Sequence, residues 1–271
     1  MNYRHAFHAG NHADVLKHIV MARIIEHLKR KDKPFRVFDA HAGIGVYDLN
    51  GPEAQKTGEW QGGIAKMQAA FAPEVEALLA PYRKVLADLN PEGGFMRCPG
   101  SPEVIARLLR PEDRFTLNEL HPDDYALLRD RYYIDARAGI TGIDATVLMK
   151  ANLPPPERRG LVLIDPPYEA TRGDFRAAAS AIQDALERFA TSVVALWYPI
   201  KDRRDTDRWH AGFAQQITRP TIAVELWMHP TDSRAGLNGS GLVIVNPPYR
   251  FADRCGAWQK ELLRHLAAGT D

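Results

Sequence analysis

Residues 161–170 read LVLIDPPYEA, and residues 242–251 read LVIVNPPYRF. In both stretches four apolar residues precede Asp or Asn and the tripeptide Pro-Pro-Tyr. A continuous apolar run that ends at a turn is typical of a strand buried on both faces of a parallel sheet. The repetition raises the question of whether both copies form a site, or whether one of them only ends a strand.

Seven stretches of the chain have the composition of strands, and helical patterns separate most of them. The predicted strands are 35–41, 114–120, 139–144, 161–165, 192–199, 221–228 and 241–246. Helices are predicted, from apolar residues that recur every three or four positions, at 11–28, 101–110, 122–132, 173–190 and 202–216. Asn11 and Ser101 are the expected N-caps of the first two helices. Strands that alternate with helices indicate an α/β fold with a mostly parallel sheet.

The connection between the first two strands is too long for one crossover helix, which needs about 12–25 residues. Helical periodicity covers 59–80 and 74–89 of this connection, with Pro81 as an interruption. We therefore expect residues 46–99 to form a helical insertion subdomain. Residues 1–45 and 100–271 would form the main domain.

The last two strands are joined by HPTDSRAGLNGS, residues 229–240, which is rich in turn residues and has no helical pattern. This segment predicts a hairpin, so the last strand would run antiparallel to the rest of the sheet. The carboxyl ends of the first five strands would then share one edge, which includes Asp165, and Asn246 would lie at the opposite edge. Strand direction therefore favours the first Pro-Pro-Tyr motif as the active one, although Asn is itself acceptable chemistry.

Small and acidic residues follow the first three strands. The first strand leads into DAHAGIG, residues 39–45, where Gly43 would let a ligand approach the backbone. Glu119 can accept hydrogen bonds from two ribose hydroxyls, and Asp144, followed by Ala145, can accept one from an adenine amino group. The dinucleotide motif GxGxxG is absent from this turn. The three strand ends predict a nucleoside pocket without a pyrophosphate clamp, which suits S-adenosylmethionine (SAM).

The segment Asp165-Pro166-Pro167-Tyr168 has the chemistry needed to hold a planar amine. The Asp165 carboxylate and the Pro166 carbonyl can each accept one N–H, which directs the nitrogen lone pair toward an electrophilic methyl group. Tyr168 offers a ring on which an extruded base can stack. These residues alone do not distinguish adenine N6 from guanine N2, cytosine N4 or a protein glutamine amide.

The composition is that of an ordinary globular protein. The chain has 271 residues, is 45% hydrophobic and carries a net charge of +1, which argues against non-specific coating of nucleic acid. It has no apolar run of about 18 residues and no signal-peptide core, so no membrane span is expected. Cys98 and Cys255 are far apart, which fits a reducing cytoplasm. Basic clusters occur at 29–33, 158–159 and 201–204, and Lys201 is a candidate substrate contact.

Along essentially its whole length the sequence resembles the RlmJ family of class I SAM-dependent methyltransferases. The strings that carry the resemblance are YRHAFHAGNHADVLKH (3–18), DAHAGIG (39–45), PGSP (99–102), ELHP (119–122), RRGLVLIDPPYE (158–169) and ALWYP (195–199). Members of that family are bacterial, cytoplasmic enzymes that methylate N6 of one specific adenine in 23S ribosomal RNA. The resemblance therefore implies a Rossmann-like class I methyltransferase fold, SAM as cofactor and 23S ribosomal RNA as partner.

The resemblance also implies roles for individual residues. Asp165 matches the residue assigned as proton acceptor at the adenine amine, and Tyr3 matches a tyrosine placed against the RNA. In the third motif the acid is retained where Asp144-Ala145 stands in place of Asp-Gly. The positions that match cofactor contacts are His18, His41, Ser101, Glu119, Asp144, Ala145 and Asp165.

Other interpretations stay open. The four histidines His5, His8, His12 and His18 could suggest a metal site, but no Cys or carboxylate pattern completes one, so none is expected. We expect their segment to fold over the cofactor edge. Methylation of another planar amine, or RNA binding without modification, are the alternative functions. For the main hypothesis we expect direct in-line transfer to a flipped base, by a monomer that needs no obligate protein partner.

Overall fold

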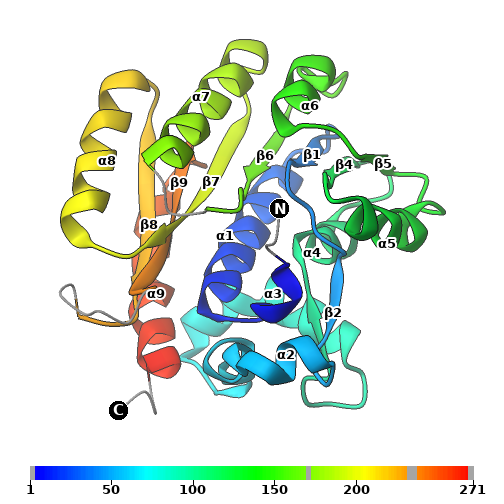
Figure 1. Cartoon of the computed structure of the whole chain (residues 1–271), viewed down its shortest axis with the longest axis vertical. Coiled ribbons are helices and arrows are strands. Elements are labelled where there is room, and N and C mark those ends of the chain that lie inside the picture. The colour runs from blue at the N-terminus through cyan, green and yellow to red at the C-terminus, as the bar shows by residue number, and fades with distance from the viewer. Residues whose placement is uncertain (1–3, 169–171, 231–236, 268–271) are drawn as a thin grey trace.

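The frame of the molecule is a seven-stranded sheet. The computed structural model describes residues 4–168, 172–230 and 237–267 (Figure 1). Its main strands are β1 (Arg36–Asp39), β4 (Arg114–Asn118), β5 (Ala138–Thr141), β6 (Gly160–Ile164), β7 (Val193–Ile200), β8 (Thr221–Trp227) and β9 (Gly239–Val245). They lie in the order β5-β4-β1-β6-β7-β9-β8. All seven predicted strands are confirmed, with small shifts at their ends.

Strand β9 runs against its two neighbours, whereas the other strand pairs of this sheet are parallel. In the pairing of β7 with β9, Val194 lies opposite Val245 and Ile200 lies opposite Gly239. The carboxyl end of β9 is therefore beside the amino end of β7. This confirms the predicted antiparallel last strand and places Asn246 at the edge opposite Asp165.

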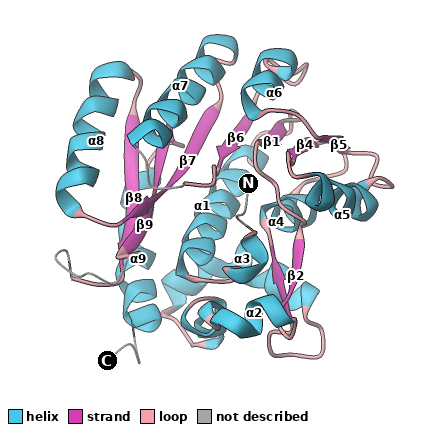
Figure 2. Ribbon diagram, viewed as in Figure 1, coloured by secondary structure: helices cyan, strands magenta, loops and turns pink. Residues whose placement is uncertain are grey.

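Helices cover both faces of the sheet (Figures 1 and 2). One face packs against α1 (His12–Lys29), α4 (Ser101–Leu108), α5 (Pro122–Tyr132) and α9 (Phe251–Ala267), and α3 (Pro73–Leu89) packs on α1. The other face packs against α6 (Ala145–Asn152), α7 (Arg172–Arg188) and α8 (Arg203–Gln216). The division follows the two-residue period of a strand. Leu161 and Leu163 join the first core, and Val162 and Ile164 join the second.

Of the two predicted N-caps, Asn11 is confirmed and Ser101 is wrong. Asn11 caps α1, because its side chain accepts the backbone N–H groups of Ala13 and Asp14 at 3.0 Å each. The N-cap of α4 is Gly100, one residue before the predicted Ser101. Ser101 is instead the first helical residue, and its side chain lowers the pKa of the Asp39 carboxyl group on the neighbouring strand.

Residues 46–99 fold against α1. The strands β2 (Val46–Asp48) and β3 (Arg97–Pro99) pair at the two ends of this segment. Between them the chain forms two helices, α2 (Pro52–Thr57) and α3, and two 3₁₀-helices, η2 (Glu59–Gly62) and η3 (Ile64–Gln68). Their apolar side chains, such as Ile64 and Tyr82, belong to the same core as α1. The division of the chain into a domain and an insertion subdomain stays a prediction.

The predicted helix over residues 59–80 is wrong in its first part, which forms only short 3₁₀ turns. Gly63 causes the break, because its α-carbon packs directly against the backbone of Gly10 and Asn11 and any side chain there would overlap them. The expected interruption at Pro81 is also wrong, since Pro81 lies inside the continuous helix α3. Burial of the α3 apolar stripe against α1 outweighs the hydrogen bond that Pro81 cannot make.

Several elements were not predicted: β2, β3, α2, α6, α9 and η1 (His5–Phe7). Helix α9 carries a readable signal, because its buried residues recur every three or four positions at Phe251, Cys255, Trp258, Leu262 and Leu266. In the part of the chain that the structure describes, no helix is both long enough and apolar enough to cross a membrane.

The residue before the second Pro-Pro-Tyr, Asn246, forms hydrogen bonds to two other segments of the chain. Asn246 has a positive φ of 52°, and its side-chain amide donates to the carbonyls of Ala190 at 3.1 Å and Ser192 at 2.9 Å. Its backbone N–H donates to the Pro220 carbonyl at 2.8 Å. Asn tolerates this left-handed backbone better than most residues. Asn246 therefore holds the end of β9 against the segments that precede β7 and β8.

We predict that Asn246→Ala lowers the free energy of unfolding by about 2 kcal/mol, because it removes two hydrogen bonds and forces Ala into a left-handed backbone. Asn246→Gly loses the same bonds without that strain, so it should be less destabilised by about 1 kcal/mol. Urea unfolding of both variants and the wild type measures the difference. Equal stability of all three proteins would contradict the structural role.

Candidate active site

A cavity of about 510 Å³ opens at the carboxyl ends of the parallel strands. The first half of α1 and the turns after β1, β4, β5, β6 and β7 form its walls. Tyr3 lies outside the described residues. The structure brings the remaining predicted site residues together in this one cavity: His18, His41, Gly43, Ser101, Glu119, Asp144, Ala145, Asp165, Pro166, Tyr168 and Lys201.

Glu119 is held in place by backbone amides at the mouth of β4. Its two carboxylate oxygens accept the N–H groups of Gly43 and His121, each at 2.8 Å. A carboxylate has about four lone-pair positions, so capacity for two further donors remains. Gly43 has a φ of +61°, and a β-carbon at this position would overlap the Tyr47 hydroxyl. These features keep the wall beside Glu119 open to a ligand with paired hydroxyls.

Asp144 uses one carboxylate oxygen to cap α6 and keeps the other for a ligand. Oδ1 accepts the backbone N–H groups of Thr146 at 2.8 Å and Val147 at 3.4 Å, and also the Thr146 hydroxyl. The hydrogen bond from the Thr146 side chain is the main cause that lowers the Asp144 pKa. Among the described residues Oδ2 accepts no hydrogen bond. That oxygen can accept an amino group of a ligand.

A chain of ionised groups that the sequence did not reveal crosses the cavity floor. Lys17 Nζ lies 2.6 Å from Asp165 Oδ2 and 2.9 Å from Asp14 Oδ1. Asp14 Oδ2 in turn accepts the Gly10 N–H at 2.8 Å and lies 2.9 Å from the His5 ring. The chain links the N-terminal segment, α1 and the turn after β6.

Burial and charge oppose each other in this chain of groups. Burial lowers the Lys17 pKa, but the carboxylates of Asp14 and Asp165 raise it well above its ordinary value. Burial likewise raises the Asp14 pKa, while His5 and Lys17 lower it well below its ordinary value. Lys17 and Asp14 are therefore both charged near neutral pH. Their spacing of three on a helix whose other residues are largely apolar is the one sequence signal of a buried ion pair.

A buried histidine, His18, and a half-buried one, His41, border the same floor. Burial lowers the pKa of His41 to about 4 and that of His18 to about 3, so both rings are neutral near pH 7. His41 Nδ1 accepts the Asp165 backbone N–H at 3.3 Å, which leaves the ring proton on Nε2. Neither ring nitrogen of His18 has a hydrogen-bond partner among the described residues. A buried imidazole without partners fits a site whose polar contact comes from a ligand.

Tyr168 is fixed by its neighbour on β7. Its hydroxyl donates to the Trp197 carbonyl at 2.9 Å, and the two rings meet edge to face at 5.7 Å. Both residues line the cavity, as does the exposed Lys201 after β7. A tyrosine ring with a tethered hydroxyl offers a preorganised surface for a planar base.

The N-terminal histidines make protein contacts at the cavity rim. Besides the His5–Asp14 pair, His8 Nδ1 lies 2.8 Å from Glu59 Oε1, and Asn11 donates to Glu59 Oε2 at 3.0 Å. Within the described ranges, no group of three or more His, Cys, Asp or Glu side chains is arranged to hold a metal ion. Residues 4–11 therefore fold against the edge of the cavity.

The sheet order with one reversed strand, and a cavity at the carboxyl edge beside β1, define a Rossmann-like class I methyltransferase fold. A family model described as "Ribosomal RNA large subunit methyltransferase D, RlmJ" matches residues 32–270. The chain belongs to this RlmJ family of ribosomal RNA large subunit methyltransferases.

Similar proteins cover nearly all of the chain. The "Ribosomal RNA large subunit methyltransferase J" of Escherichia coli is 44% identical over 253 residues, which are 93% of this chain and 89% of that protein. The protein of the same name from Haemophilus influenzae is 42% identical over 268 residues, 98% of this chain and 92% of its own. A crystal structure of a Legionella pneumophila protein, 31% identical, matches with a TM-score of 0.85 and covers 97% of this chain and 95% of its own.

Asp39, at the end of β1, is a fully buried carboxyl group behind the cavity wall. One oxygen accepts the His41 N–H at 3.3 Å, and the other has no partner among the described residues. Burial raises the Asp39 pKa to about 7, although the Ser101 side chain acts to lower it. The folded protein therefore keeps this proton over a pH range in which the unfolded chain loses it.

This raised pKa predicts a stability that depends on pH. Below the ordinary aspartate pKa of about 3.9 both states bind the proton. As the pH rises to about 7, only the folded state keeps it, so the free energy of unfolding falls across this window and then levels off. Asp39→Asn removes that loss and should be more stable than wild type at pH 8 by on the order of 3 kcal/mol.

Chemical unfolding of Asp39→Asn and wild type between about pH 4 and 8 tests this expectation. The exposed Asp130 supplies the control variant Asp130→Asn, whose stability should follow the wild-type curve. A difference between Asp39→Asn and wild type that stays constant over the range would contradict the raised pKa.

Proposed function

We propose that this chain transfers a methyl group from SAM to N6 of one specific adenine in 23S ribosomal RNA. The observation that carries the proposal is the Asp165-Pro166 turn at the end of β6, in a cavity that also contains Glu119 and Asp144. The names of the curated relatives, ribosomal RNA large subunit methyltransferases, support the reaction class and the RNA. With bacterial relatives and ribosomal RNA as substrate, the proposal places the activity in the cytoplasm.

The cavity residues fit SAM. Glu119 has acceptor capacity for both ribose hydroxyls, and Asp144 Oδ2 for the adenine amino group of the cofactor. Ala145 and Ser101 line the same wall, and His18 supplies ring nitrogens that lack a protein partner. When bound, SAM supplies a methyl group on a positively charged sulfur, which makes the methyl carbon electrophilic.

The target amine is held by Asp165 and Pro166. Lys17 binds Asp165 Oδ2, and this contact fixes the carboxylate with Oδ1 available to accept one N–H of the amine. The Pro166 carbonyl accepts the other N–H, so the nitrogen lone pair points at the methyl carbon. Asp165 takes the proton that N6 loses once its lone pair has formed the bond to that carbon. The reaction needs no covalent intermediate on the protein.

Recognition of the flipped base and its strand uses the cavity rim. Tyr168 stacks on the adenine, because its ring is already tethered through the Trp197 carbonyl. Lys201 at the mouth contacts the RNA backbone by charge. Tyr3 contacts the RNA in the same proposal, on the strength of the family resemblance alone.

Isotopically labelled SAM, purified protein and protein-free 23S RNA, followed by nucleoside mass spectrometry, test the proposal. We expect label in N6-methyladenosine and in no other nucleoside. Label in N2-methylguanosine or N4-methylcytidine would contradict the adenine assignment. Tight SAM binding without any transfer would indicate an RNA-binding module.

Asp165→Ala should reduce methyl transfer by at least about a thousandfold, since it removes the group that orients and deprotonates the amine. Lys17 keeps Asp14 as a partner in this variant, so the fold should persist, which thermal unfolding checks. Asn246→Ala in the second motif is the matched control and should retain transfer at 25 °C. Equal catalytic loss from both variants at unchanged stability would overturn the distinction between the two motifs.

A further inference from the structure

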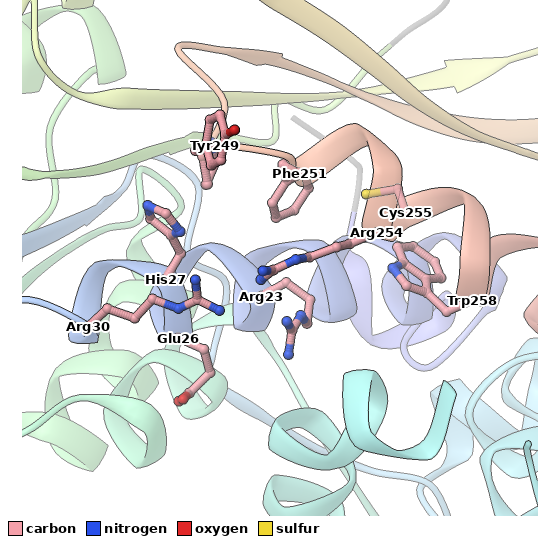
Figure 3. Close-up of a pocket in the computed structure, with 10 residues that line it drawn as sticks. Arg23, Glu26, His27, Arg30, Tyr249, Phe251, Arg254, Cys255 and Trp258 are labelled. Atoms are coloured by element: carbon pink, nitrogen blue, oxygen red, sulfur yellow. The ribbon is translucent and has the colours of Figure 1, made fainter. Parts of the chain in front are cut away.

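A second pocket, of about 220 Å³, lies beside the turn that follows β9, at the sheet edge opposite the active site. Figure 3 shows it between the second half of α1 and the start of α9. Its polar wall consists of Arg23, Glu26 and His27 from α1, the C-cap residue Arg30 and Arg254 from α9, with Tyr249 at the rim. Tyr249 belongs to the second Pro-Pro-Tyr motif, to which the proposed reaction gives no function.

One carboxylate, Glu26, shares this pocket with three arginines and a histidine, and its charge acts on Arg23. Among the described residues, Arg23, Arg30 and Arg254 form no ion pair, and Arg23 donates only to the Leu78 carbonyl at 3.5 Å. The one carboxylate in the wall, Glu26, is engaged by Lys29 at 2.7 Å. A concave cluster of unpaired guanidinium groups has the charge and the donors to bind an anion.

The arginines are close enough to affect the groups between them. Burial and then the charges of Arg30 and Arg254 lower the His27 pKa, with smaller effects from Lys31 and Arg159. Arg159 donates to the Leu28 carbonyl at 2.8 Å and also to the Lys33 carbonyl. Two basic clusters that are separate in the sequence, 29–33 and 158–159, therefore meet at this edge. The charges of Lys31 and Arg159 therefore add to those of the arginines in the pocket.

Tyr249 adds an aromatic surface to this charge. The residue is 83% exposed, an unusual position for a large ring, and it lies above α1 near His27 (Figure 3). The buried side chains of Phe251, Cys255 and Trp258 form the apolar side of the pocket. An exposed ring beside arginines matches the chemistry of nucleic acid, in which bases stack on aromatic groups and phosphates bind guanidinium groups.

We propose that this pocket binds a phosphodiester of the substrate RNA, with an unpaired base stacked on Tyr249, away from the reacting adenine. The inference rests on the proposed function, because it takes RNA as the substrate. Helix α1 joins the two sites, since Lys17 and Arg30 are 13 residues apart on it, about 20 Å along the helix axis. A folded segment of ribosomal RNA spans such a distance. The stacking ring favours RNA over an acidic protein surface, which would use the arginines alone.

Filter binding of radiolabelled 23S RNA to the double variant Arg30→Ala/Arg254→Ala tests the proposal. Loss of two phosphate contacts should weaken binding about tenfold or more and reduce the slope of log affinity against log salt by about two. Lys84→Ala/Arg129→Ala removes two exposed cations from α3 and α5 and is the control, expected to bind nearly as wild type does. Tyr249→Ala should also weaken binding, whereas Tyr249→Phe should not.

Methyl-transfer kinetics supply the second measurement. The double variant should show a raised KM for RNA with an unchanged kcat and unchanged affinity for SAM. RNA affinity and KM equal to those of the control variant would overturn the proposal and leave the pocket to a different partner, such as an acidic protein. If the wild type transferred no methyl group to RNA, the proposed function would fail, and the binding assay would still decide whether this pocket holds RNA.

Discussion

The buried ammonium group of Lys17 is the contact on which the active site depends. It joins α1 to the turn after β6, two segments that are 148 positions apart in the chain. Only 6% of the Lys17 side chain is exposed, and removing either partner of a buried ion pair leaves an uncompensated charge that costs several kcal/mol. Loss of Lys17 would leave two carboxylates without their cation, whereas loss of Asp165 leaves Lys17 paired with Asp14 at 2.9 Å.

The same constraint orders the N-terminal segment. His5 and the Gly10 N–H hold the outer oxygen of Asp14, and His8 and Asn11 bind Glu59 across the rim. Gly63 packs on the backbone of Gly10 and holds residues 59–63 against the N-terminal segment. A wall built from several fixed contacts keeps its polar groups oriented before a ligand arrives, which lowers the reorganisation that a reaction requires.

The sequence was sufficient where one local pattern decides the outcome. Apolar runs located the strands, the segment 229–240 predicted the reversal of β9, and strand ends located the cavity residues such as Glu119 and Asp144. The Lys17–Asp165 pair could not be predicted in this way, because it exists only once α1 has packed against the sheet. The errors at 59–72 and at Pro81 have the same origin. The contact of Gly63 with Gly10 interrupts the predicted helix at 59–72, whereas burial against α1 keeps α3 continuous through Pro81.

Helix α1 also fixes the orientation of the two pockets relative to each other, because it contributes residues to both. It has 18 residues, with Lys17 in the candidate active-site cavity, and Arg23, His27 and the C-cap residue Arg30 in the far pocket. Each residue turns a helix by about 100°, so one insertion between Lys17 and Arg23 would rotate the arginines out of the pocket while Lys17 kept its contact with Asp165. An insertion in the interior of α1 would therefore change the geometry between the two sites without removing a residue from either.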